Sequence, residues 1–364
     1  MADTIQNYKC PCCDAPLVFD AGKQNLHCEF CGTDVDLATM QKLDEANESG
    51  MTSSKYDWEH YEPRSFGNDE GVNFSTYSCP ACGAAITGDA SMGSTVCPYC
   101  GNATIVKGQF EGSLRPDYVI PFKVDKKRAM EAFAEACQNA PFLPDEFKNK
   151  KKIEEMAGVY VPFWMFDCDC NADIRYNAKK VTYWSDSNYE YTKTDFFKLV
   201  RSGTLSFANI PVDGSRKADD TYMEAIEPFD YKEAVDFNPA YLSGYLADKY
   251  DVTAEESIEH ANERVRKSTE SVFASTAKGY LGVVPENSFV SFSEGKIRYA
   301  LLPVWMLNIK YQGQNYKYAI NGQTGKTVGE YPVCRKKRNA YFAKVFGVAL
   351  GLSLAAALAY IKLF

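Results

Sequence analysis

The sequence predicts an α+β protein that begins with two small cysteine-built modules and ends in a long apolar helix. Three observations lead to this prediction. A cysteine pattern occurs twice near the N-terminus, an aromatic-rich middle region alternates strand-like and helix-like segments, and seventeen uncharged residues lie together near the C-terminus. The chain has 364 residues, of which 45 % are apolar and 14 % aromatic, so it can form a packed core and more than one domain.

The cysteine pattern consists of two C-x-x-C pairs separated by fourteen residues, and every cysteine of the second copy follows its counterpart by 69 residues. The flanking residues repeat as well, since Gly32-Thr33 corresponds to Gly101-Asn102. These features indicate one duplicated module. Its eight predicted metal ligands are Cys10, Cys13, Cys28, Cys31, Cys79, Cys82, Cys97 and Cys100.

Each C-x-x-C pair can form a tight turn that supplies half of a tetrahedron of thiolates, the arrangement that Zn²⁺ prefers. Glycines at positions 32, 83 and 101 suit the positive backbone dihedral angles of such turns. The spacing is typical of zinc ribbons, and it predicts two structural Zn²⁺ ions with four cysteines each. Cys12 could compete with Cys13, and His27, which precedes Cys28, is an alternative ligand.

Five cysteines lie outside the two quartets, and their odd, irregular distribution indicates reduced thiols and a cytosolic setting. Residues 1–7 are short and polar and do not resemble a secretory signal. The pair Cys168 and Cys170 is more typical of a structural pair on one strand face than of a redox site. The five are Cys12, Cys137, Cys168, Cys170 and Cys334.

The charge distribution argues against nucleic acid as a partner of the modules. The net charge of the chain is −8, and residues 1–40 carry two lysines against six acidic residues. Nonspecific affinity for nucleic acids depends chiefly on Lys and Arg side chains that displace counterions from phosphates. The modules lack that contribution.

We expect the chain to divide into a first zinc ribbon (1–40), a polar linker (41–75) with a short helix over 37–46, and a second zinc ribbon (76–110). An aromatic-rich antiparallel-sheet α+β body (115–333), a basic flank (335–338) and a transmembrane anchor (341–364) follow. Within the body, the apolar periodicity predicts helices over 125–139 and 253–275, strands over 118–124, 158–166 and 169–211, and a hairpin over 316–328.

A short motif suggests that the body consists of two related halves. Val161-Pro-Phe-Trp-Met165 is followed 141 residues later by Leu302-Pro-Val-Trp-Met306. The alternative is that both are unrelated core strands with similar packing. In either case we expect Trp164 and Trp305 to be core residues.

The apolar segment Val345–Ile361 has the length of a short transmembrane helix. Four basic residues, Arg335-Lys-Lys-Arg338, precede it, so the positive-inside rule places the N-terminal domains in the cytoplasm. The alternative is a C-terminal helix buried in the soluble body.

No catalytic motif is evident. The three histidines (His27, His60 and His260) are isolated, and Asn321-Gly-Gln-Thr-Gly-Lys326 has the pattern of a hairpin turn rather than a phosphate-binding loop. Four cysteines per ion leave no open coordination position, which is the structural arrangement. We therefore predict that the protein is not an enzyme.

The two cysteine quartets, the Pro-x-Trp-Met segments, the 318–326 hairpin and the C-terminal apolar helix resemble a bacterial family of TFIIB-type zinc-ribbon-containing proteins. Members are often labelled primosomal-protein-like or helicase-like, but the nucleotide-binding motif that a helicase needs is absent here. The resemblance implies a membrane-tethered partner of phage-shock and flotillin-like (SPFH) proteins in envelope stress.

The sequence thus favours a single-pass, membrane-anchored cytoplasmic adaptor whose zinc ribbons recruit a protein partner, with Phe30 and Tyr99 as exposed contact residues. The alternative is a membrane-associated nucleic-acid-binding factor that uses Lys150–Lys152 and Arg335–Arg338 as basic contacts.

Overall fold

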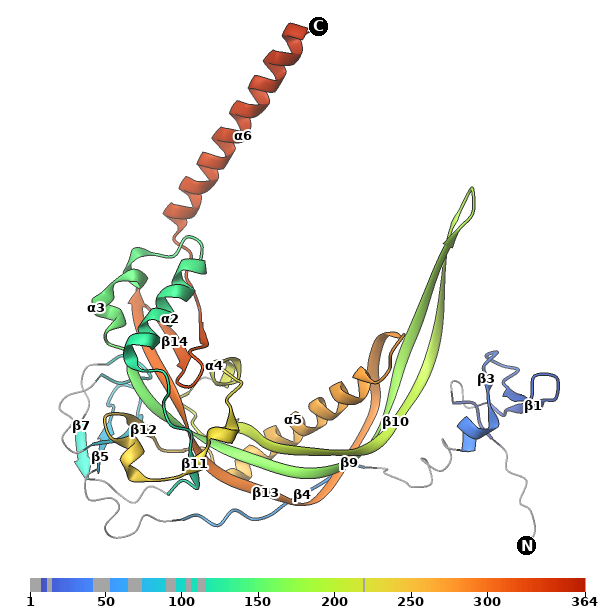
Figure 1. Ribbon diagram of the computed structural model, residues 1–364, viewed down its shortest axis with the longest axis horizontal. Coiled ribbons are helices and arrows are strands. Elements are labelled where there is room, and N and C mark those ends of the chain that lie inside the picture. The colour runs from blue at the N-terminus through green and yellow to red at the C-terminus, as the bar shows by residue number, and fades with distance from the viewer. Residues whose placement is uncertain are drawn as a thin grey trace. The chain divides into compact units, whose positions relative to one another are not determined.

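A computed structural model of the chain describes residues 8–11, 15–41, 53–64, 74–89, 96–102, 106–109, 115–218 and 220–363. It has the predicted α+β class, with antiparallel sheets, several helices and clusters of aromatic side chains (Figure 1). By internal contacts the chain forms two compact units. Unit 1 comprises Met1–Tyr61, Met165–Val212 and Glu255–Ile297, and unit 2 comprises Glu62–Trp164, Asp213–Ala254 and Arg298–Phe364. The predicted body region 115–333 contributes residues to both units.

The first module contains a small antiparallel sheet of three strands. They are β1 (Val18–Asp20), β2 (Asn25–His27) and β3 (Asp34–Val35), with β2 in the centre. Residues 37–41 are helical. The rest of the helix expected over 37–46 lies outside the described residues, as does most of the predicted linker, but the linker's β4 (Lys55–Trp58) pairs in parallel with β13 (Leu281–Tyr311).

The second module also has three strands, β5 (Phe74–Ser78), β6 (Ala85–Asp89) and β7 (Val106–Gln109), with β5 in the centre. Its sheet does not end at the module. β6 pairs antiparallel with β12 (Leu246–Asp248), which itself pairs in parallel with β9 (Ala157–Ser185). The second module is therefore part of the main sheet of unit 2.

Long strands form the framework of the body. β9 pairs with β10 (Glu190–Asp213), and β13 forms a hairpin with β14 (Gln314–Asn321), which pairs with β15 (Thr327–Gly329). β8 (Tyr118–Val119) lies between β13, to which it is parallel, and β11 (Val235–Asp236), to which it is antiparallel. The sequence indicated an antiparallel sheet; the parallel pairs of β13 and β12 were not predicted.

Two long helices match the predicted ranges. α2 (Lys126–Asn139) begins at Asp125, whose carboxylate accepts a hydrogen bond from the backbone N–H of Arg128 and so caps the helix. α5 covers Ala254–Ser275. In unit 2, Phe133 and Cys137 of α2 pack on β13 and β14; in unit 1, Val265 and Phe273 of α5 pack on β9.

The two Pro-x-Trp-Met segments make the same contacts. The indole N–H of Trp164 donates to the carbonyl of Val252 at 2.9 Å, and that of Trp305 donates to the carbonyl of Val124 at 2.8 Å. Trp164 packs edge-on against Tyr250 and Trp305 against Phe122, with ring centroids 5.0 and 5.2 Å apart. The carbonyls of the two prolines also accept equivalent bonds, Pro162 from Gly214 and Pro303 from Gly322.

These contacts define two segments with the order strand–helix–strand–strand, here called repeat 1 (β8, α2, β9 and β10) and repeat 2 (β12, α5, β13 and β14). The first strand of each repeat pairs with the long strand of the other, since β8 pairs with β13 and β12 with β9. α2 likewise packs on strands of repeat 2, and α5 packs on β9 of repeat 1 as well as on β13 of its own repeat. Trp164 and Trp305 are buried as expected. That the two halves arose from one duplicated segment stays a prediction.

Shorter elements complete unit 2. They are the 3-10 turns η1 (Asp145–Lys148), η2 (Tyr231–Glu233) and η3 (Pro239–Leu242) and the short helices α3 (Lys150–Ile153) and α4 (Asp220–Ala225). The last helix, α6 (Arg335–Leu363), is long and apolar enough over Arg335–Ala357 to cross a membrane, and none of that apolar stretch is buried. The expected alternative, a helix buried in the soluble body, is therefore wrong.

Candidate metal centres

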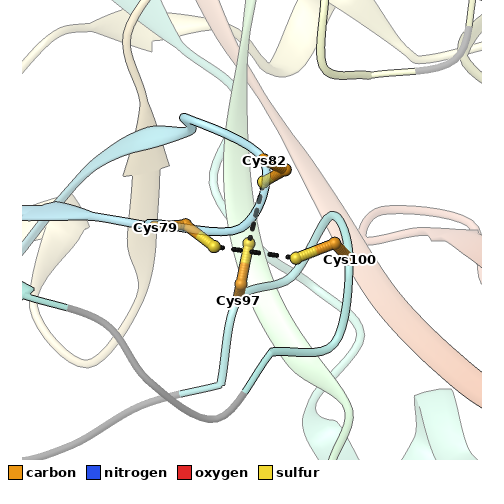
Figure 2. Close-up of side chains that lie close together, drawn as sticks. All are labelled: Cys79, Cys82, Cys97 and Cys100. Carbon is orange, nitrogen blue, oxygen red and sulfur yellow. Dashed lines mark hydrogen bonds between the residues drawn. The ribbon is translucent and has the colours of Figure 1, made fainter.

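The four cysteines of the second module converge on one point. Figure 2 shows Cys79 and Cys82 on one turn facing Cys97 and Cys100 on the other. The sulfur atoms of Cys79 and Cys100 lie 3.6 Å apart, and those of Cys82 and Cys97 lie 3.7 Å apart. All four sulfurs lie within 4.8 Å of one another, so this group could hold a metal ion.

Backbone hydrogen bonds explain why these residues form the two turns. The N–H of Cys79 donates to the carbonyl of Ala84 at 2.9 Å, and the N–H of Gly83 donates back to the carbonyl of Cys79 at 2.8 Å. The second turn repeats this pair of bonds between Cys97 and Asn102 and between Gly101 and Cys97. Gly83 and Gly101 have φ of 71° and 68°, a region that favours glycine, as the sequence indicated.

The environment of the thiols differs across the group. Burial raises the pKa of Cys79, but hydrogen bonds from the backbone N–H groups of Cys82 and Ala81 outweigh this effect and lower the pKa to about 6. Burial raises the pKa of Cys97 far above its ordinary value. A bound cation would favour the thiolate form of all four side chains, because the thiolate is the ligand.

The first module brings together three of its four predicted ligands, Cys10, Cys28 and Cys31. The sulfurs of Cys10 and Cys31 are 3.5 Å apart, and the turn at Cys28 has the same two backbone bonds, to Thr33 and from Gly32. Cys13 and its competitor Cys12 lie outside the described residues. This group too could hold a metal ion.

The alternative ligand His27 does not join the sulfur group. Its Nδ1 atom lies 2.6 Å from a carboxylate oxygen of Asp34, and the other oxygen of Asp34 is 3.0 Å from the ammonium of Lys23. His27 therefore contributes to the small sheet, where its strand neighbours that of Asp34.

Tyr99 was predicted to be exposed, and this is wrong. The side chain is 5 % exposed, and its hydroxyl donates a 2.5 Å hydrogen bond to the carboxylate of Asp248 in β12. Neighbouring bonds attach the same turn to β13 and β14, since the amide groups of Asn308 and Asn315 donate to the carbonyls of Pro98 and Cys100. At Gly101 an added Cβ would lie 3.2 Å from that of Asn308, so the turn fits closely against the sheet.

Phe30, the counterpart of Tyr99 in the first module, is exposed as expected. Its ring is 80 % exposed, and Val18 and Phe19 of β1 are about half exposed. All three are exposed apolar side chains in the described part of the first module, and the surface around Phe30 is called here the Phe30 surface.

A group of buried acidic side chains, which Tyr99 joins to the second module, was not predicted; it is called here the acidic group. Asp248 also accepts a hydrogen bond from the hydroxyl of Ser215, and burial raises the pKa of Asp248 to about 6. Burial, with the nearby charges of Asp220 and Asp248, raises the pKa of Asp213 to about 8. One carboxylate oxygen of Asp213 has no hydrogen-bond partner among the described residues. The aspartates lie in separate segments, so only the tertiary structure brings them together.

Two other cysteines singled out in the sequence are structural. Cys168 and Cys170 are buried on β9, and burial raises the pKa of both thiols, that of Cys168 to about 12. Their environment disfavours the reactive thiolate.

The hairpin of β9 and β10 exposes an aromatic cluster that the sequence analysis did not single out. The rings of Trp184 and Tyr191 stack at 5.3 Å, and Tyr183 and Tyr189 are 72 % and 67 % exposed. Asp186 holds the turn by accepting bonds from the N–H groups of Asn188 and Tyr189. The four aromatic residues among the nine of 183–191 were a signal that could have identified it.

Fold and site together define an α+β protein with two cysteine groups of metal-site geometry and a C-terminal helix of membrane-spanning length. No family model matches the chain, and no solved structure matches it, so the resemblance to TFIIB-type zinc-ribbon proteins stays a prediction. The chain is 34 % identical over 343 residues to the uncharacterized protein YdjG of Bacillus subtilis (strain 168), covering 94 % of this chain and 95 % of YdjG. The chain belongs to the same family as YdjG.

Proposed function

We propose that the protein is a non-enzymatic, single-pass membrane adaptor whose first cysteine module recruits a protein partner in the cytoplasm. The observation that carries this proposal is the difference between the two modules. The second is bound into the sheet of unit 2 through Tyr99 and β6, whereas the first presents the Phe30 surface to solvent. Exposed aromatic and aliphatic side chains of this kind favour protein–protein contact.

Zn²⁺ is the proposed ion in both modules. A tetrahedron of thiolates with metal–sulfur distances of about 2.3 Å has sulfur–sulfur distances of about 3.8 Å. The observed 3.6 and 3.7 Å of the second module agree with that geometry. Four cysteines in the second module, and Cys13 with its three partners in the first, would hold one ion each and leave no site for a substrate.

The membrane anchor is α6. Its apolar stretch is unburied, and a soluble protein gains nothing by exposing such a surface to water. The four basic residues at its start favour the cytoplasm for that side of the membrane, and with it the modules and both units.

The charge of the first module favours a protein partner over nucleic acid. Residues 1–40 carry six acidic residues and two lysines, so docking would rest on the apolar ring of Phe30 and its neighbours rather than on phosphate contacts. The resemblance described above suggests a flotillin-like (SPFH) scaffold of the envelope-stress response as the partner.

Chemical cross-linking in native membranes, followed by mass spectrometry, tests the proposal. We expect a discrete protein to be captured by the full chain and lost with Phe30→Ser. It should be retained with Val284→Ser, a matched control that alters a 57 % exposed apolar residue of unit 1. Equal capture by both variants would refute docking at the Phe30 surface. Capture of nucleic-acid complexes alone would favour the membrane-associated nucleic-acid-binding factor.

A further inference from the structure

A cavity of about 1010 Å³ lies in unit 2 beside the beginning of α6. Side chains from η1, α3, the β13–β14 turn and the first turn of α6 line it. Five of the lining residues are basic and two, Asp145 and Glu146, are acidic. We call this site the basic cavity, and its basic residues are Lys152, Lys310, Arg335, Lys336 and Lys337.

Only one of the five basic residues is neutralised by an ion pair in the described part of the chain. The ammonium of Lys337 lies 2.6 Å from the carboxylate of Asp145, and this hydrogen bond and charge lower the pKa of Asp145. Within the described residues, the other four form no ion pair. Like charges around one cavity repel each other, so an anion bound there would be stabilised by all of them.

The walls of the cavity are held in place before any ligand binds. Lys337 also donates to the carbonyl of Leu143 at 2.9 Å, and the N–H of Cys334 donates to the carbonyl of Phe142 at 2.8 Å. The ring of Phe142 packs against that of Tyr341 at 5.3 Å. These contacts fix the first two turns of α6 to the loop that follows α2 (Figure 1).

The opposite wall is the turn between β13 and β14. Gln312 and Gly313 have φ of 50° and 80°, and Tyr311 pairs with Gln314, which is the two-residue turn typical of tight hairpins. This turn places Lys310 and Tyr311 at the cavity. A preorganised wall reduces the entropy lost when a ligand binds.

The composition of the cavity suits a phospholipid better than a small ion alone. Val333 lines it and is 48 % exposed, so an apolar surface adjoins the basic residues. Tyr341 and Phe342 of α6 are 53 % and 59 % exposed, and aromatic residues are enriched where a helix enters the headgroup region. Clusters of basic residues next to a membrane helix attract anionic lipids.

We propose that the basic cavity binds the phosphate group of an anionic phospholipid in the leaflet that α6 enters. This inference rests on the proposed membrane insertion of α6. The phosphate, with its single negative charge, would lie among Lys152, Lys310 and Lys336, reduce their mutual repulsion and fix unit 2 against the membrane surface. The sequence analysis assigned Lys150–Lys152 and Arg335–Arg338 as possible contacts to nucleic acid, and four of the five basic residues of the cavity belong to these two segments.

The test uses the full chain in lipid nanodiscs of phosphatidylcholine alone or mixed with phosphatidylglycerol, and native mass spectrometry counts the lipids retained. We expect the wild-type chain to retain phosphatidylglycerol. In the double variant Lys152→Gln/Lys310→Gln, the affinity for phosphatidylglycerol should fall by at least about tenfold. Lys152→Arg/Lys310→Arg should restore binding. The matched control is Lys126→Gln/Lys127→Gln, which removes two exposed lysines of α2 outside the cavity.

Three outcomes would overturn the inference. Equal retention of the two lipids would exclude selection of an anionic headgroup, while leaving the anchor intact. Displacement of phosphatidylglycerol by inorganic phosphate would assign the site to a free anion. Failure of the chain to enter nanodiscs would instead refute the anchor itself, and with it both proposals. Because Lys152 and Lys310 also line a small cavity beside Cys97, the metal content of each variant is measured in parallel.

Discussion

The two cysteine modules have the same spacing and the same turns, yet they differ in what surrounds them. The ring of Phe30 in the first module is 80 % exposed, whereas Tyr99 at the equivalent position of the second is 5 % exposed. The second module shares a sheet with β12 and bonds to Asp248, and the first has its own three-stranded sheet. The second module is therefore packed into the main sheet of unit 2, whereas the first module keeps the equivalent side chain exposed to solvent.

A single hydroxyl group accounts for part of this difference. Tyr99 carries a donor that satisfies the buried carboxylate of Asp248, and phenylalanine at that position would leave the carboxylate with one donor fewer. In the first module no such donor is needed, and a fully apolar ring is suited to contact with a partner.

The largest expected effect comes from removing one ligand from each module at equivalent positions. Cys97→Ser should lower the free energy of unfolding of unit 2 by about 4 kcal/mol or more, because that module is packed into its sheet. Cys28→Ser should release metal from the first module and leave the unfolding of unit 2 unchanged. Metal content and thermal unfolding of the full chain in detergent would check both. Equal destabilisation by the two variants would show that the first module is integrated as well.

The acidic group that contacts the second module predicts a fall of stability with rising pH. Burial raises the pKa of Asp213 to about 8, so the folded chain binds a proton that an unfolded chain, with an aspartate pKa of about 3.9, has released. Stability should therefore fall as the pH rises between about 4 and 8 and then become level. From about pH 6.5 to about pH 8 the loss is about 2 kcal/mol.

Asp213→Asn should remove the slope between about pH 6.5 and 8 in the full chain, as followed by denaturant unfolding at several pH values. Below about pH 6 a slope remains, because burial also raises the pKa of Asp248 to about 6. Asp20→Asn in the first module is the control, because Asp20 lies on strand β1 and is not part of the acidic group. A slope between about pH 6.5 and 8 that persists in Asp213→Asn would assign the pH dependence to another group.

A smaller effect is expected for the hydroxyl itself. Tyr99→Phe removes one donor to Asp248, which keeps its bonds from Ser215 and from the N–H of Lys249, so the cost is about 1–2 kcal/mol. Denaturant unfolding would measure it. If Tyr99→Phe has no effect in a chain that already carries Asp248→Asn, the hydrogen bond is the cause; the same effect in both backgrounds would point to packing.

The smallest effect on stability is expected for Phe30→Ser, whose side chain is exposed. The free energy of unfolding should change by less than about 0.5 kcal/mol, although partner capture is lost. Thermal unfolding of the variant beside wild type would check this. A large destabilisation would show that Phe30 packs within the protein.

The sequence was most informative where a local pattern has a local cause. The C-x-x-C spacing and its glycines identify the turns because each turn is closed by its own backbone bonds, and the periodicity over 125–139 and 253–275 located α2 and α5. The repeated Trp motif indicated equivalent surroundings for Trp164 and Trp305.

Long-range arrangement was not accessible in the same way. Tyr99 was expected on an exposed turn because its partner, Asp248, is distant in the chain and only β12 brings it near. The basic cavity likewise combines lysines from α3, β13 and α6, each of which alone has the pattern of a solvated charge. β8 of repeat 1 pairs in parallel with β13 of repeat 2. This exchange of strands between the repeats cannot be predicted from local periodicity.

The exchange of strands between the repeats also affects how the chain folds. α2 is made early, but the strands that cover its apolar face, β13 and β14, come near the end of the described chain. Closing such long loops costs entropy before any contact is gained, so folding should be slow and both repeats should form together. A chain cut between the repeats would leave α2 without β13 and β14 and α5 without β9, so we expect that the repeats cannot be separated as independent folding units.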